Sequence, residues 1–123
     1  MTVKLFDSEL KVMEVLWKEG DITAKAIVGI LGKSIGWNKN TTYTVIKKCI
    51  EKGAIERLEP NFVCRALISK EDVQGSEVDE LVDKLFDGSM EMLFASLVGR
   101  KKLPSDMIEK LKHIVGEAGG KPK

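Results

Sequence analysis

The sequence predicts a mainly α-helical fold with one small β-hairpin. Apolar residues recur at helical spacing along most of the 123 residues, which is typical of amphipathic helices with one buried face. After Gly53 the spacing changes to a strand-like pattern. Glycines and helix-capping residues separate the segments. The predicted order is three helices, a hairpin and three further helices.

The first helix is expected to begin near Asp7, because a carboxylate at a helix start accepts backbone N–H groups, and to end at Gly20. A second, shorter helix is expected to begin after the cap residue Thr23 and to end at Gly32. Residues 33–37 are then expected to form a turn. The apolar stripes of the two helices are Leu10, Val12, Met13, Leu16 and Trp17, and Ile27, Val28 and Leu31.

The third helix is predicted from Asn38 to Glu51 and has two different faces. Residues 22–50 contain five lysines and no acidic residue, so this stretch should carry a positive potential that attracts polyanions. The inward stripe is apolar and consists of Val45, Ile46, Cys49 and Ile50. The outward face is polar and basic and consists of Lys39, Asn40, Tyr43, Thr44, Lys47 and Lys48.

The hairpin is predicted from strands at residues 54–59 and 62–68, joined by a tight turn at Pro60 and Asn61. Three helices followed by a hairpin are the arrangement of a winged helix-turn-helix. In this fold the outer face of the third helix can enter the major groove of DNA, and the hairpin, or wing, lies beside it.

The outward side chains suit contact with DNA, because asparagine can pair with adenine, threonine can contact a phosphate or a thymine methyl, and lysine neutralises phosphates. Trp37 could donate its indole N–H to the DNA backbone or simply wedge the turn. The candidate DNA-binding residues are Thr23, Trp37, Asn38, Lys39, Asn40, Thr41, Tyr43, Thr44, Lys47, Lys48, Arg57 and Asn61, with Arg65 as a further candidate on the wing. A winged-helix module that binds only protein is the alternative.

The C-terminal part returns to helical spacing. Ser69 is expected to cap one helix, with a break allowed near Gly75 and Ser76. Gly88 separates a second helix, and Ser105 is expected to cap a third.

These three helices carry more large apolar side chains than they can bury among themselves. A second copy of the chain would cover them and would place two reading helices on a palindromic operator, whereas packing against the N-terminal domain is the alternative. The candidate dimerisation residues are Leu81, Leu85, Phe86, Met90, Leu93, Phe94, Leu97, Met107, Leu111 and Ile114. The predicted parts are a winged-helix DNA-binding domain at 1–69, a helical dimerisation domain at 70–117 and a flexible tail at 118–123.

Composition limits the other functional classes. The net charge is only +1. No apolar run is long enough to cross a bilayer, and the N-terminus does not resemble a signal peptide, so a cytoplasmic protein without membrane insertion is expected. A single histidine, no Gly-rich phosphate loop and no metal-ligand spacing argue against an enzyme and predict no cofactor and no metal. Cys49 and Cys64 are predicted to be buried free thiols, with a redox or metal role as the alternative.

Several residues are similar to those of a known family, the BlaI/MecI penicillinase and methicillin-resistance repressors. In the N-terminal part the similar residues are Asp7, Glu9, Leu10, Val12, Met13, Trp17, Trp37, Thr41, Thr44, Lys52, Gly53 and Ala54. In the C-terminal part they are Phe86, Gly88 and Leu103. The order and spacing of the two tryptophans, the two threonines and the Lys-Gly-Ala sequence are the most specific part, and the resemblance covers nearly the whole chain.

The resemblance implies a homodimeric transcriptional repressor that binds a dyad operator, for example of β-lactam-resistance or stress genes. It also implies cleavage by a membrane sensor protease near Ser96 and Leu97, where this chain has Ser-Leu in place of the family's Asn-Phe pair. A copper-responsive branch of the family carries C-terminal cysteine pairs. This chain has no cysteine after Cys64, so copper sensing by that route is not expected.

Overall fold

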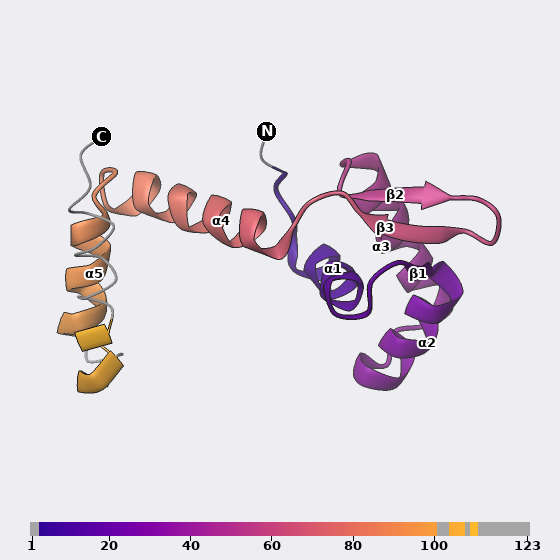
Figure 1. Ribbon diagram of the computed structural model, residues 1–123, viewed down its shortest axis with the longest axis horizontal. Helices are drawn as coiled ribbons and strands as arrows, with labels where there is room; N and C mark the ends of the chain where they lie inside the picture. The colour runs from indigo at the N-terminus through magenta and orange to yellow at the C-terminus, as the bar shows by residue number, and fades with distance from the viewer. Residues whose placement is uncertain (1–2, 101–103, 108, 111–123) are drawn as a thin grey trace. The chain divides into compact units, whose positions relative to one another are not determined.

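The computed structural model describes residues 3–100, 104–107 and 109–110 (Figure 1). The chain divides into two compact units, Met1–Glu77 and Val78–Lys123. The first holds α1 (Asp7–Glu19), β1 (Ile22–Thr23), α2 (Ala24–Ile35), α3 (Lys39–Glu51), β2 (Ile55–Leu58) and β3 (Val63–Ala66). Helix α4 (Lys70–Leu85) begins in the first unit and ends in the second, which also holds α5 (Met90–Gly99). The mainly helical fold with a small sheet is as predicted.

Side chains define where the first three helices begin. The predictions of Thr23 and Asn38 as caps are confirmed, because Thr23 Oγ1 accepts from the Ala26 N–H at 3.1 Å and Asn38 Oδ1 accepts from the Thr41 N–H at 2.8 Å. The prediction of Asp7 as the cap of α1 was wrong. The cap residue is Phe6, and Asp7 is the first helical residue. The negative charge of Asp7 there interacts favourably with the positive end of the helix dipole.

Helix α2 is longer than predicted. It continues through Gly32 to Ile35, so the expected turn at residues 33–37 is helical over its first part. Gly36, with φ of 74°, adopts the left-handed conformation that ends the helix, and its N–H bonds to the Gly32 carbonyl at 3.2 Å. A glycine inside a helix costs only about 1 kcal/mol, which the buried neighbour Leu31 offsets.

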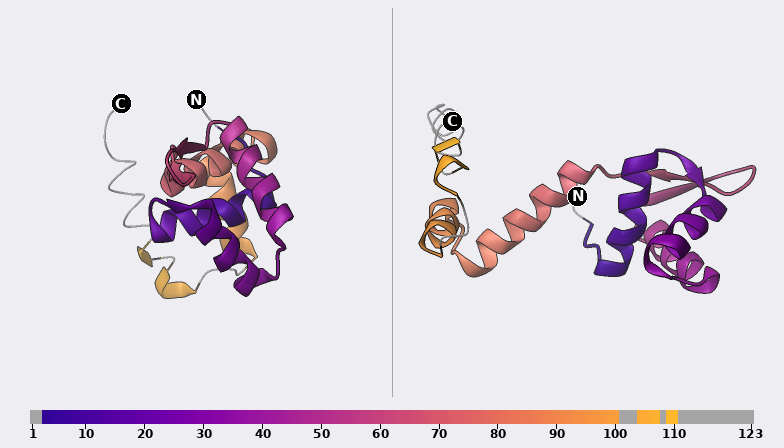
Figure 2. Two further views of the ribbon diagram at one scale, coloured as in Figure 1. Left: turned by 90° about the vertical axis from the view of Figure 1, so that its right-hand side faces the viewer. Right: turned by 90° about the horizontal axis from the view of Figure 1, so that it is seen from below.

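The three strands form an antiparallel sheet in the order β1-β3-β2. The hairpin strands are shorter than the predicted 54–59 and 62–68, and the turn between them spans residues 59–62. This turn projects past the helices of the first unit in Figure 1 and in the right view of Figure 2. Strand β1 was not predicted, because two residues are too short to show a strand period.

The helices and the sheet of the first unit enclose one apolar core. Its largest fully buried apolar side chains include Met13, Ile27, Ile46 and Ile55. Trp17 packs at the edge of this core and donates its indole N–H to the Ile68 carbonyl at 3.0 Å, which fastens the segment that leaves the hairpin.

Both cysteines are buried free thiols, as predicted. Burial raises the pKa of the Cys49 thiol to about 12 and that of the Cys64 thiol to about 11. The thiols are therefore protonated at neutral pH, which disfavours nucleophilic or metal-binding chemistry.

Helix α4 is continuous, so the break allowed near Gly75 and Ser76 does not occur. Its start matches the prediction, because Ser69 Oγ accepts from the Asp72 N–H at 3.0 Å. Helix α5 begins after Gly88, which has a φ of 78°, and is capped by Ser89. Residues 105–107 and 109–110 are also helical. Within the described part of the chain, no helix combines the length and hydropathy that a membrane crossing requires.

Candidate nucleic-acid interface

Helix α3 has the two predicted faces. Val45, Ile46 and Cys49 are buried in the core, and Ile50 is half-buried at its edge. Helices α1 and α2 and strand β2 pack against α3, and most of its polar side chains remain exposed to solvent. The exposed candidates of this helix and its cap are Asn38, Lys39, Asn40, Thr41, Thr44, Lys47 and Lys48.

The N-terminal ends of α2 and α3 differ from those of the other described helices. Helices α1, α4 and α5 carry acidic residues in their first turns, whereas α2 and α3 carry none. The backbone N–H groups at a helix start carry a partial positive charge that binds phosphate oxygens. The capping side chains of Thr23 and Asn38 therefore mark two helix ends whose positive potential is not reduced by their own acidic residues.

Two aromatic candidates lie partly inside the fold. Trp37 is half-buried and packs against the core, which favours the wedge over an indole directed only at DNA. Tyr43 is also half-buried, and its ring lies 6.0 Å from that of Phe62, the last residue of the turn of the wing. Tyr43 therefore joins α3 to the wing. The sequence had placed it on the outward face of the helix, but its side chain does not point fully outward.

Both arginines of the wing are paired with carboxylates. Arg57 donates from Nε to Glu59, and its guanidinium carbon lies 3.8 Å from the centroid of the Phe62 ring. Arg65 Nε lies 2.9 Å from Asp21 Oδ2. Asn61 is exposed in the turn, with a φ of 72°. The wing thus presents its cations with anionic partners already in place.

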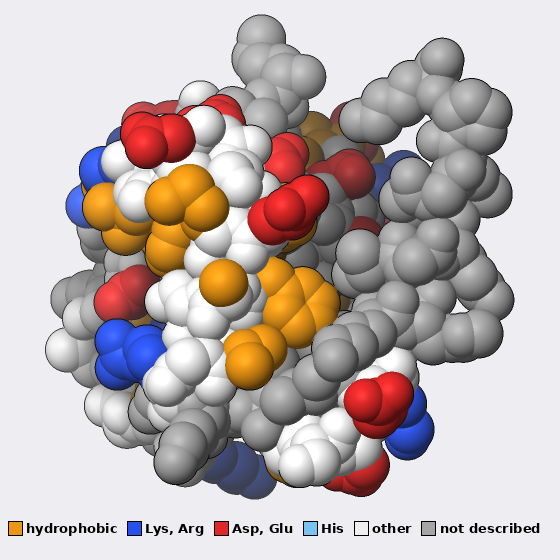
Figure 3. Space-filling view, turned by 90° about the vertical axis from the view of Figure 1, so that its left-hand side faces the viewer, with side chains coloured by type: hydrophobic (Ala, Val, Ile, Leu, Met, Phe, Trp, Pro, Cys, Tyr) orange, Lys and Arg blue, Asp and Glu red, His pale blue; other side chains and the backbone are white. Residues whose placement is uncertain are grey.

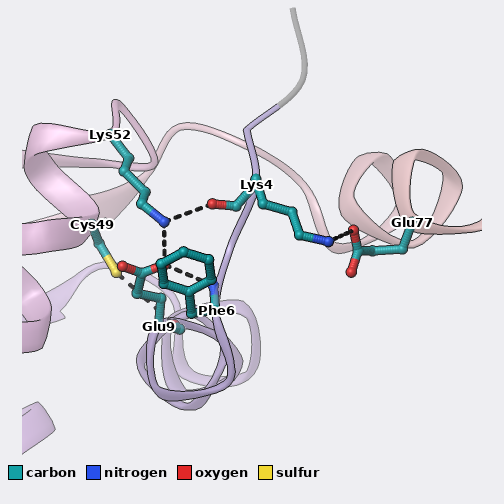
Figure 4. A network of polar contacts seen from close by, with 6 residues as sticks. All are labelled: Lys4, Phe6, Glu9, Cys49, Lys52 and Glu77. Carbon is teal, nitrogen blue, oxygen red and sulfur yellow. Dashed lines mark hydrogen bonds and ion pairs between the residues drawn. The ribbon is translucent and has the colours of Figure 1, made fainter. Parts of the chain in front are cut away.

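A partly buried ion pair that the sequence did not reveal holds the C-terminal end of α3 against α1 (Figure 4). Lys52 Nζ lies 2.6 Å from Glu9 Oε1 and 2.7 Å from the Lys4 carbonyl oxygen. The same Glu9 oxygen accepts from the Phe6 N–H at 2.8 Å, and Lys52 lies 4.0 Å from the Phe6 ring centroid. The Glu9 side chain is almost completely buried, at 1% exposed.

The surroundings of Glu9 keep its carboxyl group ionised. Burial by itself raises the pKa of this group, but the hydrogen bonds from Lys52 and the Phe6 N–H and the charges of Lys52 and Lys48 outweigh it, so the pKa lies below its ordinary value. In the sequence Glu9 is one of several acids on a charged helix face. Its contact with Lys52, forty-three positions along the chain, is what gives Glu9 this structural role.

In the second unit, apolar side chains remain at the surface. Figure 3 shows hydrophobic groups gathered on the face that carries α5. Of the candidate dimerisation residues, Leu81, Leu85, Met90, Leu97 and Met107 are exposed, and Phe86, Leu93 and Phe94 are half-buried. Leu111 and Ile114 lie outside the described residues. The suggested cleavage position, Ser96 and Leu97, lies within α5.

No group of His, Cys, Asp and Glu within the described ranges could hold a metal ion. In the contacts described above, Glu9, Asp21 and Glu59 each pair with a lysine or arginine. The exposed face of α3, the two helix ends and the wing are instead suited to binding an extended polyanion.

Comparison with known proteins supports this interpretation. A family model described as penicillinase repressor matches residues 5–117. The chain is 25% identical to the methicillin resistance regulatory protein MecI of Staphylococcus aureus, over 94% of this chain and 96% of that protein. It is 24% identical to the penicillinase repressor of Bacillus licheniformis, over 98% and 95% of the two chains. These matches confirm the resemblance seen in the sequence and the prediction that the chain is not an enzyme.

Solved structures match the fold of the first unit. The DNA-binding domain of the repressor BlaI matches with a TM-score of 0.54 and 30% identity, over 58% of this chain and 90% of that domain. The Bacillus licheniformis BlaI monomeric form in complex with the blaP half-operator matches with a TM-score of 0.51 and 31% identity, over 56% and 87% of the two chains. The winged-helix prediction is therefore confirmed.

Proposed function

Because this chain belongs to the penicillinase repressor family, we propose that it is a transcriptional repressor that binds a dyad operator in duplex DNA as a homodimer. The observation that carries the proposal is the acid-free stretch that covers α2 and α3 as far as Ile50. Residues 22–50 cover α2 and all of α3 except its last residue, Glu51, and contain five lysines and no acid. A polyanion with regularly spaced phosphates is the partner that such a surface fits.

The residues of α3 divide into two roles in this proposal. Asn40, Thr41 and Thr44 are exposed, short and polar, so they can contact base edges in the major groove. Lys39, Lys47 and Lys48 contribute affinity through phosphates, with little dependence on sequence. The helix starts after Thr23 and Asn38 bind phosphate oxygens through backbone N–H groups, and Trp37 holds the turn between the two helices.

The second unit is proposed to bring two copies of the chain together, so that the second copy binds the other half of the dyad. Leucine and methionine side chains of α4 and α5 are exposed in the single chain, and each would contribute about 1.5–3 kcal/mol when buried. When two chains pair through this face by two-fold symmetry, the face is buried on both chains, and the pairing sets the spacing of the two reading helices. The BlaI complex with a half-operator contains a monomeric form, which agrees with one chain for each half-site.

The proposal places the protein in the cytoplasm, where its operator DNA is. It also includes inactivation by a membrane sensor protease, since a cut between Ser96 and Leu97 would divide α5 and remove part of the dimer face. Coexpression with such a protease, followed by mass spectrometry of the fragments, tests this step. An intact chain whose operator stays repressed would contradict it.

The experiment that tests DNA binding begins with selection of duplexes from a randomised library by the full chain. The selected duplex then serves as the probe in fluorescence anisotropy between about 50 and 200 mM salt, where affinity should fall steeply as phosphate counterions are released. The alternative, a winged-helix module that binds only protein, predicts that no duplex is enriched.

A charge-reversal variant, Lys39→Glu with Lys47→Glu, locates the interface on α3. Affinity should fall by at least about a hundredfold, because like charges then face the phosphates. Lys48 is left unchanged, since its charge also acts on the buried Glu9. The matched control is Lys11→Glu with Lys18→Glu, which makes the same change of charge at two exposed positions of α1. Equal losses in both variants would contradict the assignment to α3.

A further inference from the structure

The wing contains an arginine whose present partner is a carboxylate of the adjoining turn. Arg57 lies in β2, and Glu59 is the first residue after that strand. The two side chains are 50% and 61% exposed. Exposed ion pairs of this kind are weak because water screens them, so another anion can compete for the arginine.

An aromatic contact places this arginine beside α3. The Arg57 guanidinium stacks on the Phe62 ring at 3.8 Å, and the Phe62 ring contacts Tyr43 of α3 at 6.0 Å between centroids. Tyr43 lies one helical turn from both Asn40 and Lys47, which are exposed. A phosphate bound next to the exposed face of α3 therefore comes close to Arg57.

We infer that Glu59 is an affinity-determining residue that competes with a DNA backbone phosphate for Arg57. The inference rests on the proposed DNA-binding function and adds a residue that no sequence pattern indicated. When DNA binds, two anions meet at one cation. Glu59 must either leave Arg57 or remain beside the phosphate and repel it, and both outcomes lower the affinity of the wing for DNA.

The charge distribution agrees with this role. Helix α2 contains no acidic residue, and α3 has its one acid, Glu51, at its C-terminal end. The wing carries Glu56 and Glu59 beside Arg57 and Arg65. The acidic residues of the interface region are therefore concentrated on the element that lies beside the reading helix. Helix α3 is therefore the main source of affinity for DNA, and the acidic residues of the wing set how much the wing adds to that affinity.

The test compares Glu59→Gln with Glu56→Gln on the full chain, using the duplex selected above as the probe. Both variants remove one negative charge from the wing. Glu56 lies opposite Arg65 in the strand register, and neighbouring strand residues face opposite sides of the sheet, so Glu56 and Arg57 point apart. Glu59→Gln should bind DNA about two- to fivefold more tightly than Glu56→Gln, the effect of one exposed ion pair.

A double-mutant cycle shows whether the effect passes through Arg57. Arg57→Gln should weaken binding and reduce the slope of log affinity against log salt by about one phosphate contact. In that background Glu59→Gln should have the same effect as Glu56→Gln. Equal affinities of the two single variants, or weaker binding by Glu59→Gln, would overturn the inference. Failure of the proposed function is distinct, because the unmodified chain would then select no duplex.

Discussion

The two units of the chain bury their apolar residues to very different extents. In the first unit Met13, Ile27 and Ile46 are completely enclosed by helices and sheet. In the second, none of the described side chains of α5 is buried, and Leu85 is 64% exposed. A core of the first kind stabilises a unit by itself, whereas a face of the second kind gains its stabilisation only from further contacts. This difference agrees with the proposed division into a reading unit, which binds DNA, and an assembling unit, which forms the dimer.

The largest expected effect lies in the assembling unit. Leu85→Glu places a charge on the proposed dimer face of each copy, and two lost leucines together cost about 3–6 kcal/mol of association free energy. The dimer dissociation constant should therefore rise more than about a hundredfold in sedimentation equilibrium. Gln74→Glu is the matched control, because it introduces the same charge at an exposed position of α4. An unchanged dimer in the Leu85 variant would remove this face from the interface.

The second effect concerns the reading unit. Lys52→Met leaves the buried Glu9 without its cation and should lower the free energy of unfolding by about 3 kcal/mol at neutral pH, the low end for a broken buried pair. The pH dependence of the unmodified chain's stability follows from the pKa of Glu9. The pKa of Glu9 is depressed in the folded state, so its stabilising contribution is complete above the unfolded pKa and is lost as the pH falls through the folded pKa.

Denaturant unfolding at several pH values measures both parts of this prediction. The Lys52→Met variant should lose less stability than the unmodified chain between neutral and acidic pH, because protonation relieves its uncompensated carboxylate. Lys70→Met removes a lysine from an exposed pair with Glu14 and serves as the control, with an expected change below about 1 kcal/mol. Similar stability losses in the two variants would show that the Glu9 pair has no special weight.

The smallest effect compares equivalent caps in the two units. Thr23→Ala and Ser89→Ala each remove one side-chain cap, from α2 and α5 respectively, at a cost of about 1 kcal/mol. The Thr23 variant should lower the melting temperature of the reading unit, whereas the Ser89 variant should act mainly on dimer stability. Circular dichroism melts at two protein concentrations separate the outcomes, and a concentration-dependent shift for Thr23→Ala would argue against independent units.

Much of the fold could be predicted from local signals. Caps at Thr23, Asn38 and Ser69, the apolar stripe of α3 and the change of period after Gly53 each involve residues close together in the chain. The errors arose where two local signals competed. Gly32 and Gly36 both suit a helix end, and only the positive φ of Gly36 shows which one ends α2. Gly75 and Ser76 weaken a helix without ending it.

The sequence predicted which residues are candidates for DNA binding and on which face of a helix they lie. The structure shows which of them contact one another. Exposure of Asn40, Thr44 and Lys47 follows from helical spacing alone. The inward turn of Tyr43 toward Phe62 does not, because the two rings belong to segments nineteen positions apart that only the packing of wing and helix brings together. Glu59 similarly has no feature in the sequence that separates it from other surface acids, and its pairing with Arg57 is visible only in the structure.

The sequence by itself determined the order of the helices and the hairpin, the two faces of α3, the buried state of both cysteines and the family of the chain. These depend on local periodicity, on capping chemistry and on residue order. Tertiary structure alone decided that Glu9 is buried against Lys52, that Arg57 is held between Glu59 and Phe62, and that Ile22 and Thr23 form a strand. Each of these depends on contacts between distant segments, whose free energy has no signature in the spacing of neighbouring residues.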